Sequence, residues 1–92
     1  MKNIRAEVTV HGTVQGVGFR FATARQAKSL GLAGWVRNTW HHSVEAVFEG
    51  EEPNVKSMVR WCHEGPTFAR VSHVDVAYLP ATGSLQSFTV RG

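Results

Sequence analysis

The segment over residues 12–20, GTVQGVGFR, constrains the fold of this 92-residue chain more than any other feature. It places three glycines within seven positions, directly after an alternating strand pattern and directly before a helical one. Glycine lets consecutive backbone N–H groups curve closely around one anion at a helix N-terminus. Arg20 falls in the first turn of that helix, where a cation is unfavourable by about 0.3–1 kcal/mol unless an anion lies beside it. We therefore interpret the segment as a phosphate-binding loop.

Size and composition indicate one small domain. A chain of 92 residues that is 42% hydrophobic can build a single core. The sequence has no apolar run of about 20 residues and no apolar region near its N-terminus, which predicts a soluble, cytoplasmic protein without membrane contact. Cys62 is the only cysteine, so no internal disulfide can form and a buried structural thiol is expected. The net charge of +3 favours anionic partners but does not distinguish small anions from nucleic acid.

Alternation of apolar and polar residues predicts the strands. Every second residue over 4–10 is apolar, which is typical of a half-buried strand. Residues 33–40 and 43–49 form a predicted hairpin, and strand-like patterns return over 71–79 and 85–91.

Two segments have helical spacing instead. Residues 19–30 form the first predicted helix, with Gly31 as its stop and a core stripe of Phe21, Ala24, Ala27 and Leu30. The second begins at Glu51-Glu52-Pro53 and ends at Gly65-Pro66, with Val55, Met58, Val59 and Cys62 as its stripe. The order is β-α-β-β-α-β followed by a short C-terminal strand. We expect an α+β fold, a two-layer sandwich with two helices on one face of an antiparallel sheet.

Two motifs at a matching separation carry a family resemblance. Residues 12–20 and residues 34–38, GWVRN, resemble the two signature segments of the acylphosphatase family. The likeness covers essentially the whole chain, since residues 31–34, Val44-Glu45 and Gly65-Pro66 also fall where family members carry similar residues. The resemblance implies a ferredoxin-like fold for a single domain over residues 1–92. It also implies metal-free hydrolysis of the carboxyl–phosphate bond of small acyl phosphates. We expect no cofactor, and a monomer by default.

Carried over by residue, the resemblance makes Arg20 the phosphate-binding arginine and Asn38 the residue that orients the attacking water. The phosphate, or inorganic phosphate or sulfate in its place, would be held by the backbone N–H groups of Gln15, Gly16, Val17, Gly18, Phe19 and Arg20. This agrees with the chemistry, because a carboxylate leaves without a general acid and phosphoryl transfer needs mainly positioning and charge stabilisation. A guanidinium matches phosphate oxygens as a fork, and a carboxamide can hold a water without changing its own charge.

Other side chains near these motifs have structural interpretations. We expect the Gln15 side chain to brace the loop, and Val17 and Phe19 to anchor it in the core. Arg37 neighbours Asn38 on a strand, so it is predicted to point to the opposite sheet face and into solvent.

The chain departs from the family pattern after Asn38, where His41-His42 replaces an Asp-Gly type of turn. A non-glycine residue at positive φ costs on the order of 1 kcal/mol, so the geometry of this turn stays open. Adjacent strand residues point to opposite faces, which argues against a metal site at the pair. His11, His63 and His73 are expected to be isolated surface residues.

Three other functions were weighed. RNA-recognition domains share this element order, but they carry an aromatic consensus on a central strand, where the bases stack. The predicted open face of this sheet has no such aromatic residues on its first and third strands; the residues there are Arg5, Glu7, Thr9, Glu45, Val47 and Glu49. A dinucleotide site would need a third glycine where Phe21 stands. A non-catalytic acylphosphatase-like module, of the kind found in hydrogenase-maturation carbamoyltransferases, is the remaining alternative, and we expect no nucleic-acid partner.

Overall fold

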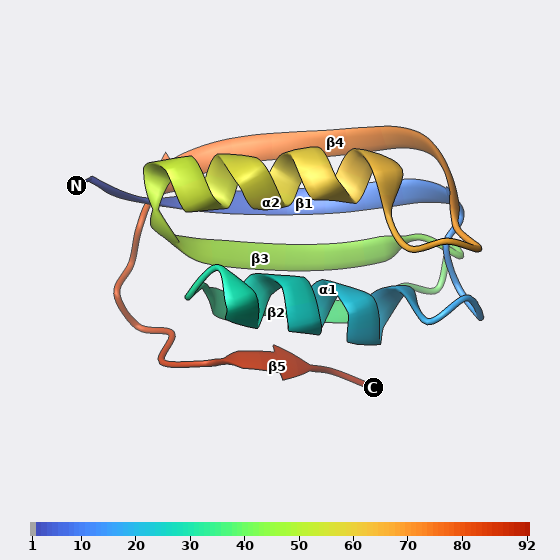
Figure 1. Cartoon of the computed structure of the whole chain (residues 1–92), viewed down its shortest axis with the longest axis horizontal. Helices are drawn as coiled ribbons and strands as arrows, with labels where there is room; N and C mark the ends of the chain where they lie inside the picture. The colour runs from blue at the N-terminus through green and yellow to red at the C-terminus, as the bar shows by residue number, and fades with distance from the viewer. Residues whose placement is uncertain (1) are drawn as a thin grey trace.

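The computed structural model describes residues 2–92, so Met1 of the predicted domain lies outside the described residues. The elements follow the expected order, coloured from blue to red in Figure 1. The strands are β1 (Asn3–Thr13), β2 (Ala33–Asn38), β3 (Val44–Glu51), β4 (Arg70–Pro80) and β5 (Phe88–Val90). The helices are α1 (Phe19–Ser29) and α2 (Glu52–Glu64). Neither helix of residues 2–92 is long and apolar enough to cross a membrane.

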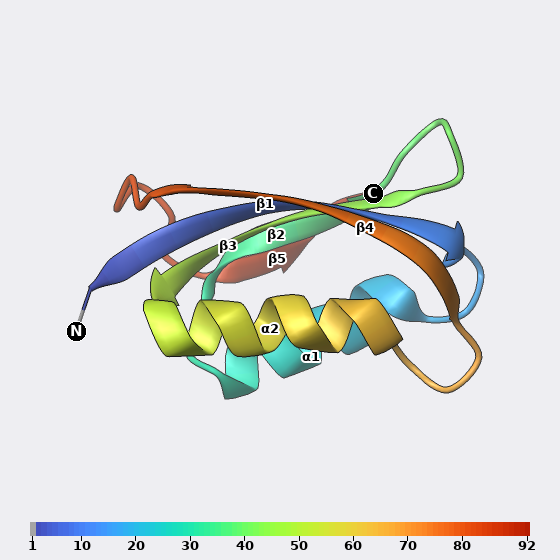
Figure 2. The same cartoon turned by 90° about the horizontal axis from the view of Figure 1, so that it is seen from above.

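The described strands form one sheet in the order β4-β1-β3-β2-β5. The four longer strands pair antiparallel, as predicted, whereas β5 pairs with β2 in parallel, so the sheet is mixed. The parallel pairing follows from the path of the chain, because β4 ends at the end of the molecule where β2 begins (Figure 1). Figure 2 shows both helices on one face of the sheet. The predicted ferredoxin-like α+β sandwich is confirmed.

The core lies between the helices and the sheet. The alternation in β1 buries Ala6, Val8 and Val10 at 0–1% exposure, and every predicted core residue of α2 is buried. Helix α1 ends at Ser29, and Gly31 follows at φ 69° with its N–H donating to the Lys28 carbonyl, as expected for a glycine stop.

The predicted core stripe of α1 was wrong at its first position, because Phe21 is 66% exposed. The helix buries Phe19, Thr23, Ala24 and Ala27 instead. Phe19 enters the core at the first helical residue, and Phe21 lies two residues later, about 200° around a helix of 3.6 residues per turn. Buried Thr23 is tolerated because its hydroxyl donates to the Phe19 carbonyl at 2.7 Å.

The sheet face opposite the helices carries the polar alternation that the sequence predicts. Arg5 pairs with Glu49, Glu7 with Val47 and Thr9 with Glu45 across β1 and β3, so this part of the face has no aromatic platform.

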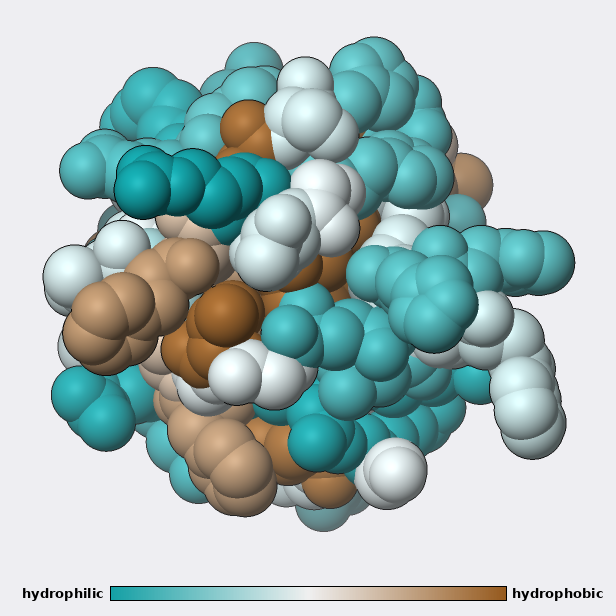
Figure 3. All heavy atoms as spheres, turned by 90° about the vertical axis from the view of Figure 1, so that its right-hand side faces the viewer, coloured by the Kyte–Doolittle hydropathy of each residue, from teal (hydrophilic) through white to brown (hydrophobic). Residues whose placement is uncertain are grey.

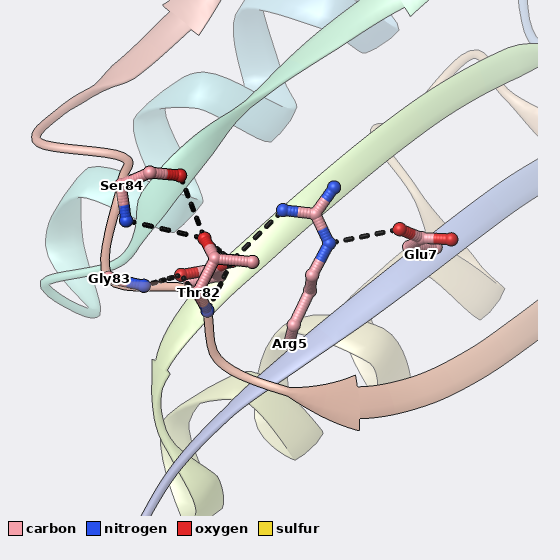
Figure 4. Close-up of polar contacts among 6 residues, drawn as sticks. Arg5, Glu7, Thr82, Gly83 and Ser84 are labelled. Carbon is pink, nitrogen blue, oxygen red and sulfur yellow. Dashed lines mark hydrogen bonds and ion pairs between the residues drawn. The ribbon is translucent and has the colours of Figure 1, made fainter.

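One charged residue of that face, Glu49, is buried, which the alternation did not predict. The connection between β4 and β5 folds over Glu49 and leaves it 5% exposed. Figure 4 shows Thr82 and Gly83 of this connection near Arg5 of β1. Its carboxylate accepts hydrogen bonds from Arg5 Nη1, from the N–H and hydroxyl of Thr82 and from the N–H of Gly83. Glu49 therefore ties the connection that leads to β5 onto the middle of the sheet.

Candidate active site

The loop between β1 and α1 forms an open concave turn. Gly16 has φ 74° and Gly18, the N-cap of α1, has φ 76°, a left-handed backbone that side chains rarely adopt. A Cβ built on either glycine would meet no other atom within 4 Å, so both glycines border free space. The concavity at this turn is thus kept open by backbone conformation.

The N-terminus of α1 faces this space with free donors. The first hydrogen bond into the helix runs from the N–H of Ala22 to the carbonyl of Gly18. No side chain caps the helix and no acidic residue stands in its first turn. The amides that precede Ala22 therefore have no intrahelical acceptor, and the positive end of the helix dipole is uncompensated within the described residues.

The loop is held in place by a side chain that precedes its glycines. Gln15 Nε2 donates to the carbonyl of Thr39 at 3.0 Å and to the carbonyl of Ser43 at 2.9 Å, which joins the loop to the β2–β3 turn. Val14 and Phe19 are buried on either side of the loop, and Val17 packs partly buried against the core. The predicted bracing and anchoring roles are confirmed.

Arg20 lies in the first turn of α1 and is bound to the far end of the chain. Its Nη1 donates to the carbonyl of Arg91 at 3.0 Å, just beyond β5. The guanidinium of Arg91 in turn stacks 4.4 Å from the centroid of the Trp35 ring on β2. The sequence carried no signal for this contact, because only the parallel pairing of β5 with β2 brings residue 91 beside α1.

Asn38 is the last residue of β2, and its Oδ1 is buried with no hydrogen-bond partner among residues 2–92. A buried carbonyl oxygen without a donor costs about 1–3 kcal/mol. Such an atom in a folded protein is typically satisfied by a water or a ligand. The Asn38 oxygen is therefore poised to accept a hydrogen bond from a bound molecule.

The two predicted side chains meet at one small cavity of about 110 Å³. Its lining includes Gly16, Gly18, Phe19, Arg20, Phe21 and Asn38. Gln15 and Val17 belong to the same loop but are not among the lining residues. Phe21 is the lining residue that the sequence analysis assigned to the core. A larger hollow of about 510 Å³ lies on the open sheet face and contains none of the predicted site residues.

Arg37 points away from this cavity, as predicted. Its Nε donates to Glu45 at 2.8 Å on the exposed sheet face. Arg37 is adjacent to Asn38 in sequence, but its side chain lies on the opposite face of the sheet. Its substitution therefore serves as a control for the loss of one positive charge outside the cavity.

The turn after Asn38, where His41-His42 replaces an Asp-Gly type of turn, has a left-handed backbone at one of the two histidines. His42 has φ 66°, the strained conformation that the sequence left open. The hydroxyl of Thr39 accepts hydrogen bonds from the N–H groups of His41 and Ser43, which stabilises the turn. Figure 2 shows this connection projecting away from the helices, so the histidine pair lies off the cavity, which is lined by other residues.

Two of the histidines expected to be isolated are neighbours. His11 and His73 pair across β1 and β4, and both contact Asp75, at 3.0 Å and 2.6 Å. The hydrogen bond from His73, and then that from His11, hold the pKa of the Asp75 carboxyl below its ordinary value. Strand register, which periodicity alone does not specify, brings them together. Within residues 2–92, no group of three or more His, Cys, Asp or Glu side chains is arranged to hold a metal ion.

Comparison with known proteins agrees with this geometry. The family model named Acylphosphatase matches residues 6–90. The acylphosphatase of Rubrobacter xylanophilus is 54% identical over 87 residues, which cover 95% of this chain and 79% of the relative. The structure of an acylphosphatase from Coxiella burnetii superimposes with a TM-score of 0.92 at 38% identity, covering 98% of this chain and 94% of that one.

A larger protein contains the same fold. Full-length HypF in its phosphate- and nucleotide-bound form matches with a TM-score of 0.89 at 25% identity, over 99% of this chain but only 12% of HypF. The comparisons thus include both short acylphosphatases and a small part of a long protein. The match over residues 6–90 and the near full-length similarity to short relatives show that this chain belongs to the acylphosphatase family of hydrolases.

Proposed function

We propose that this acylphosphatase hydrolyses small acyl phosphates by holding the phosphate at Arg20 and orienting the attacking water with Asn38. The backbone N–H groups of Gln15, Gly16, Val17, Gly18, Phe19 and Arg20 complete the phosphate site. The observation that carries the proposal is the buried, unpartnered Oδ1 of Asn38 in the same small cavity as Arg20 and the two left-handed glycines.

Phosphate binding rests on two sources of positive charge. The guanidinium of Arg20 and the N-terminus of α1 repel each other until an anion lies between them, so a bound phosphate relieves that repulsion. The bond to the Arg91 carbonyl holds Arg20 in place before substrate arrives, which lowers the entropic cost of using it. A guanidinium can also bind two phosphate oxygens at once.

The hydrolytic step needs little more than orientation. A water molecule donates one O–H to Asn38 Oδ1 and directs its lone pair at phosphorus. The new P–O bond forms as the bond between phosphorus and the acyl oxygen breaks, and the carboxylate leaves with that electron pair. The water's proton passes to a phosphate oxygen, so the step balances without a separate base. Positive charge from Arg20 and the amides stabilises the charge on the transferring group.

The proposal has several further features. The reaction is complete with the chain's own groups, so we propose activity without metal or cofactor. We also propose that residues 1–92 act as a single, monomeric, cytoplasmic domain whose partner is the small substrate and not nucleic acid. The site as described recognises the phosphate that all acyl phosphates share.

A turnover assay with acetyl phosphate in the presence of EDTA tests the proposal. Arg20→Ala should lower kcat/KM by at least about 10²-fold, because the loss of one charge-stabilising donor has effects of that size. Asn38→Ala should lower kcat by a similar factor while changing phosphate affinity little, because it removes the water's acceptor and no phosphate ligand. Arg37→Ala removes an equal charge from the opposite face and should leave both constants unchanged.

Phosphate binding can be measured separately from turnover. Phosphate or sulfate should raise the Tm of the wild-type protein by mass action, and Arg20→Ala should abolish most of that rise. Full activity of Arg20→Ala, or loss of activity on EDTA treatment, would contradict the mechanism. A stable fold that binds phosphate but turns over no acyl phosphate would instead favour the non-catalytic module; the match to a small part of HypF shows that this fold also occurs within a longer protein.

A further inference from the structure

The phosphate cavity is too small to enclose a phosphate group together with an extended acyl group. Its volume is about 110 Å³, whereas pockets that enclose drug-sized organic ligands measure about 300–1,000 Å³. With a phosphate group held against Arg20 and the glycine turn, little of this space remains for the rest of the substrate. An acyl group larger than acetyl must extend beyond the rim, where it meets the side chain that stands there.

That side chain is Phe21. It lines the cavity together with Arg20 and Asn38, yet it remains 66% exposed. It is absent from the hydrophobic core and from the partly buried residues packed against it, so within residues 2–92 core packing does not account for an aromatic ring here. Figure 3 views the end of the molecule that carries the β1–α1 loop and shows apolar side chains exposed among hydrophilic ones.

We propose that the ring of Phe21 packs against the acyl group and makes this chain selective for acyl phosphates with an aromatic or extended apolar acyl group. This rests on the proposed function, since it needs the phosphate at Arg20. Phe21 follows Arg20 in the first turn of α1 and lines the same cavity, so its ring stands beside the proposed phosphate site. A flat apolar acyl group would cover part of the exposed ring and be released from water in the same step. The methyl group of acetyl phosphate is too small to do so.

Parallel assays with benzoyl phosphate and acetyl phosphate test whether Phe21 contacts the acyl group. Phe21→Ala should lower kcat/KM for benzoyl phosphate about 5- to 10-fold, mainly through KM, as expected for the loss of an aromatic contact at an open rim. The value for acetyl phosphate should change less than twofold. Phe21→Leu, which keeps an apolar side chain, should fall between the wild type and Phe21→Ala.

Phe68 supplies the matched control. It is 78% exposed, in the connection between α2 and β4, and it does not line the cavity. Phe68→Ala should leave the ratio of the two kcat/KM values unchanged. Inhibition by inorganic phosphate should be nearly the same in all variants, because phosphate has no apolar group to pack against the ring, and equal Tm values would verify folding.

Two results would overturn the proposal. If Phe21→Ala left the ratio of the kcat/KM values for benzoyl phosphate and acetyl phosphate unchanged, Phe21 would not contact the acyl group. That failure leaves the proposed function intact, because acetyl phosphate would still be hydrolysed in an Arg20-dependent way. If the wild-type protein hydrolysed neither substrate, the proposed function would fail and this proposal with it.

Discussion

The carboxylate of Glu49 offers the sharpest test of how the fold is held together. Glu49 is 5% exposed and accepts hydrogen bonds from four donors on Arg5, Thr82 and Gly83. Glu49→Gln removes the charge and turns one acceptor oxygen into an NH2 group that faces donors. The change therefore breaks the tie that Figure 4 shows between the sheet and the β4–β5 connection.

The size of the loss follows from these contacts. A hydrogen bond to a charged group contributes about 1.5–3 kcal/mol, and the variant loses at least two of them. Water can replace partners on the exposed side of Thr82 and Gly83, which returns part of that energy. We expect a net decrease of about 2 kcal/mol in the free energy of unfolding at pH 7, or a Tm lower by roughly 8–16 °C for a domain of this size.

Acidification should reduce the difference. Burial by itself raises the pKa of Glu49, but the hydrogen bonds from Arg5, Thr82 and Gly83 together outweigh it and hold the pKa below its ordinary value. A folded-state pKa that is depressed contributes stability above the unfolded pKa, about 4.3 for Glu, and that stability is lost as pH falls through the folded pKa. Urea titrations of wild type and Glu49→Gln should therefore differ at pH 7, and the difference should shrink as the pH falls below about 4.3.

Glu7→Gln is the matched control. Glu7 pairs with the same Arg5 at 2.9 Å, but its side chain is 48% exposed, so its loss should cost less than about 1 kcal/mol. Equal losses for the two variants, or a Glu49→Gln deficit that does not shrink as the pH falls below about 4.3, would refute the reasoning.

Three further outcomes are expected. Gly16→Ala should destabilise the fold by about 1–2 kcal/mol in thermal melts, because φ is 74° and no clash adds to the strain, and it should also shrink the Tm rise with phosphate. His42→Gly should raise Tm by a few degrees, because it relieves the φ of 66°, while leaving kcat/KM for acetyl phosphate unchanged. Cys62 should react with a thiol reagent only as fast as the protein unfolds, because burial raises the pKa of its thiol to about 12; rapid labelling of native protein would contradict this.

Local patterns were sufficient for most of the fold, and the two motifs were sufficient to propose the site residues. Alternation in β1, the stripe of α2 and the glycine stop at Gly31 each depend on neighbours within a few residues, and all appear as predicted. The motif over residues 12–20 likewise encodes its own turn, because glycine at positions 16 and 18 permits a left-handed backbone. Arg20 and Asn38 line one cavity, as their motifs implied.

Tertiary structure decided what depends on register and on chain path. The exposure of Phe21 follows from which residue of α1 first enters the core, and the pairing of His11 with His73 from the register of β1 and β4. Glu49 is buried, and Arg20 donates a hydrogen bond to the Arg91 carbonyl, only because segments more than 30 residues apart in the sequence lie side by side. The periodicity of apolar residues depends on positions two to four residues apart in the sequence. It therefore carries no information on contacts between distant segments.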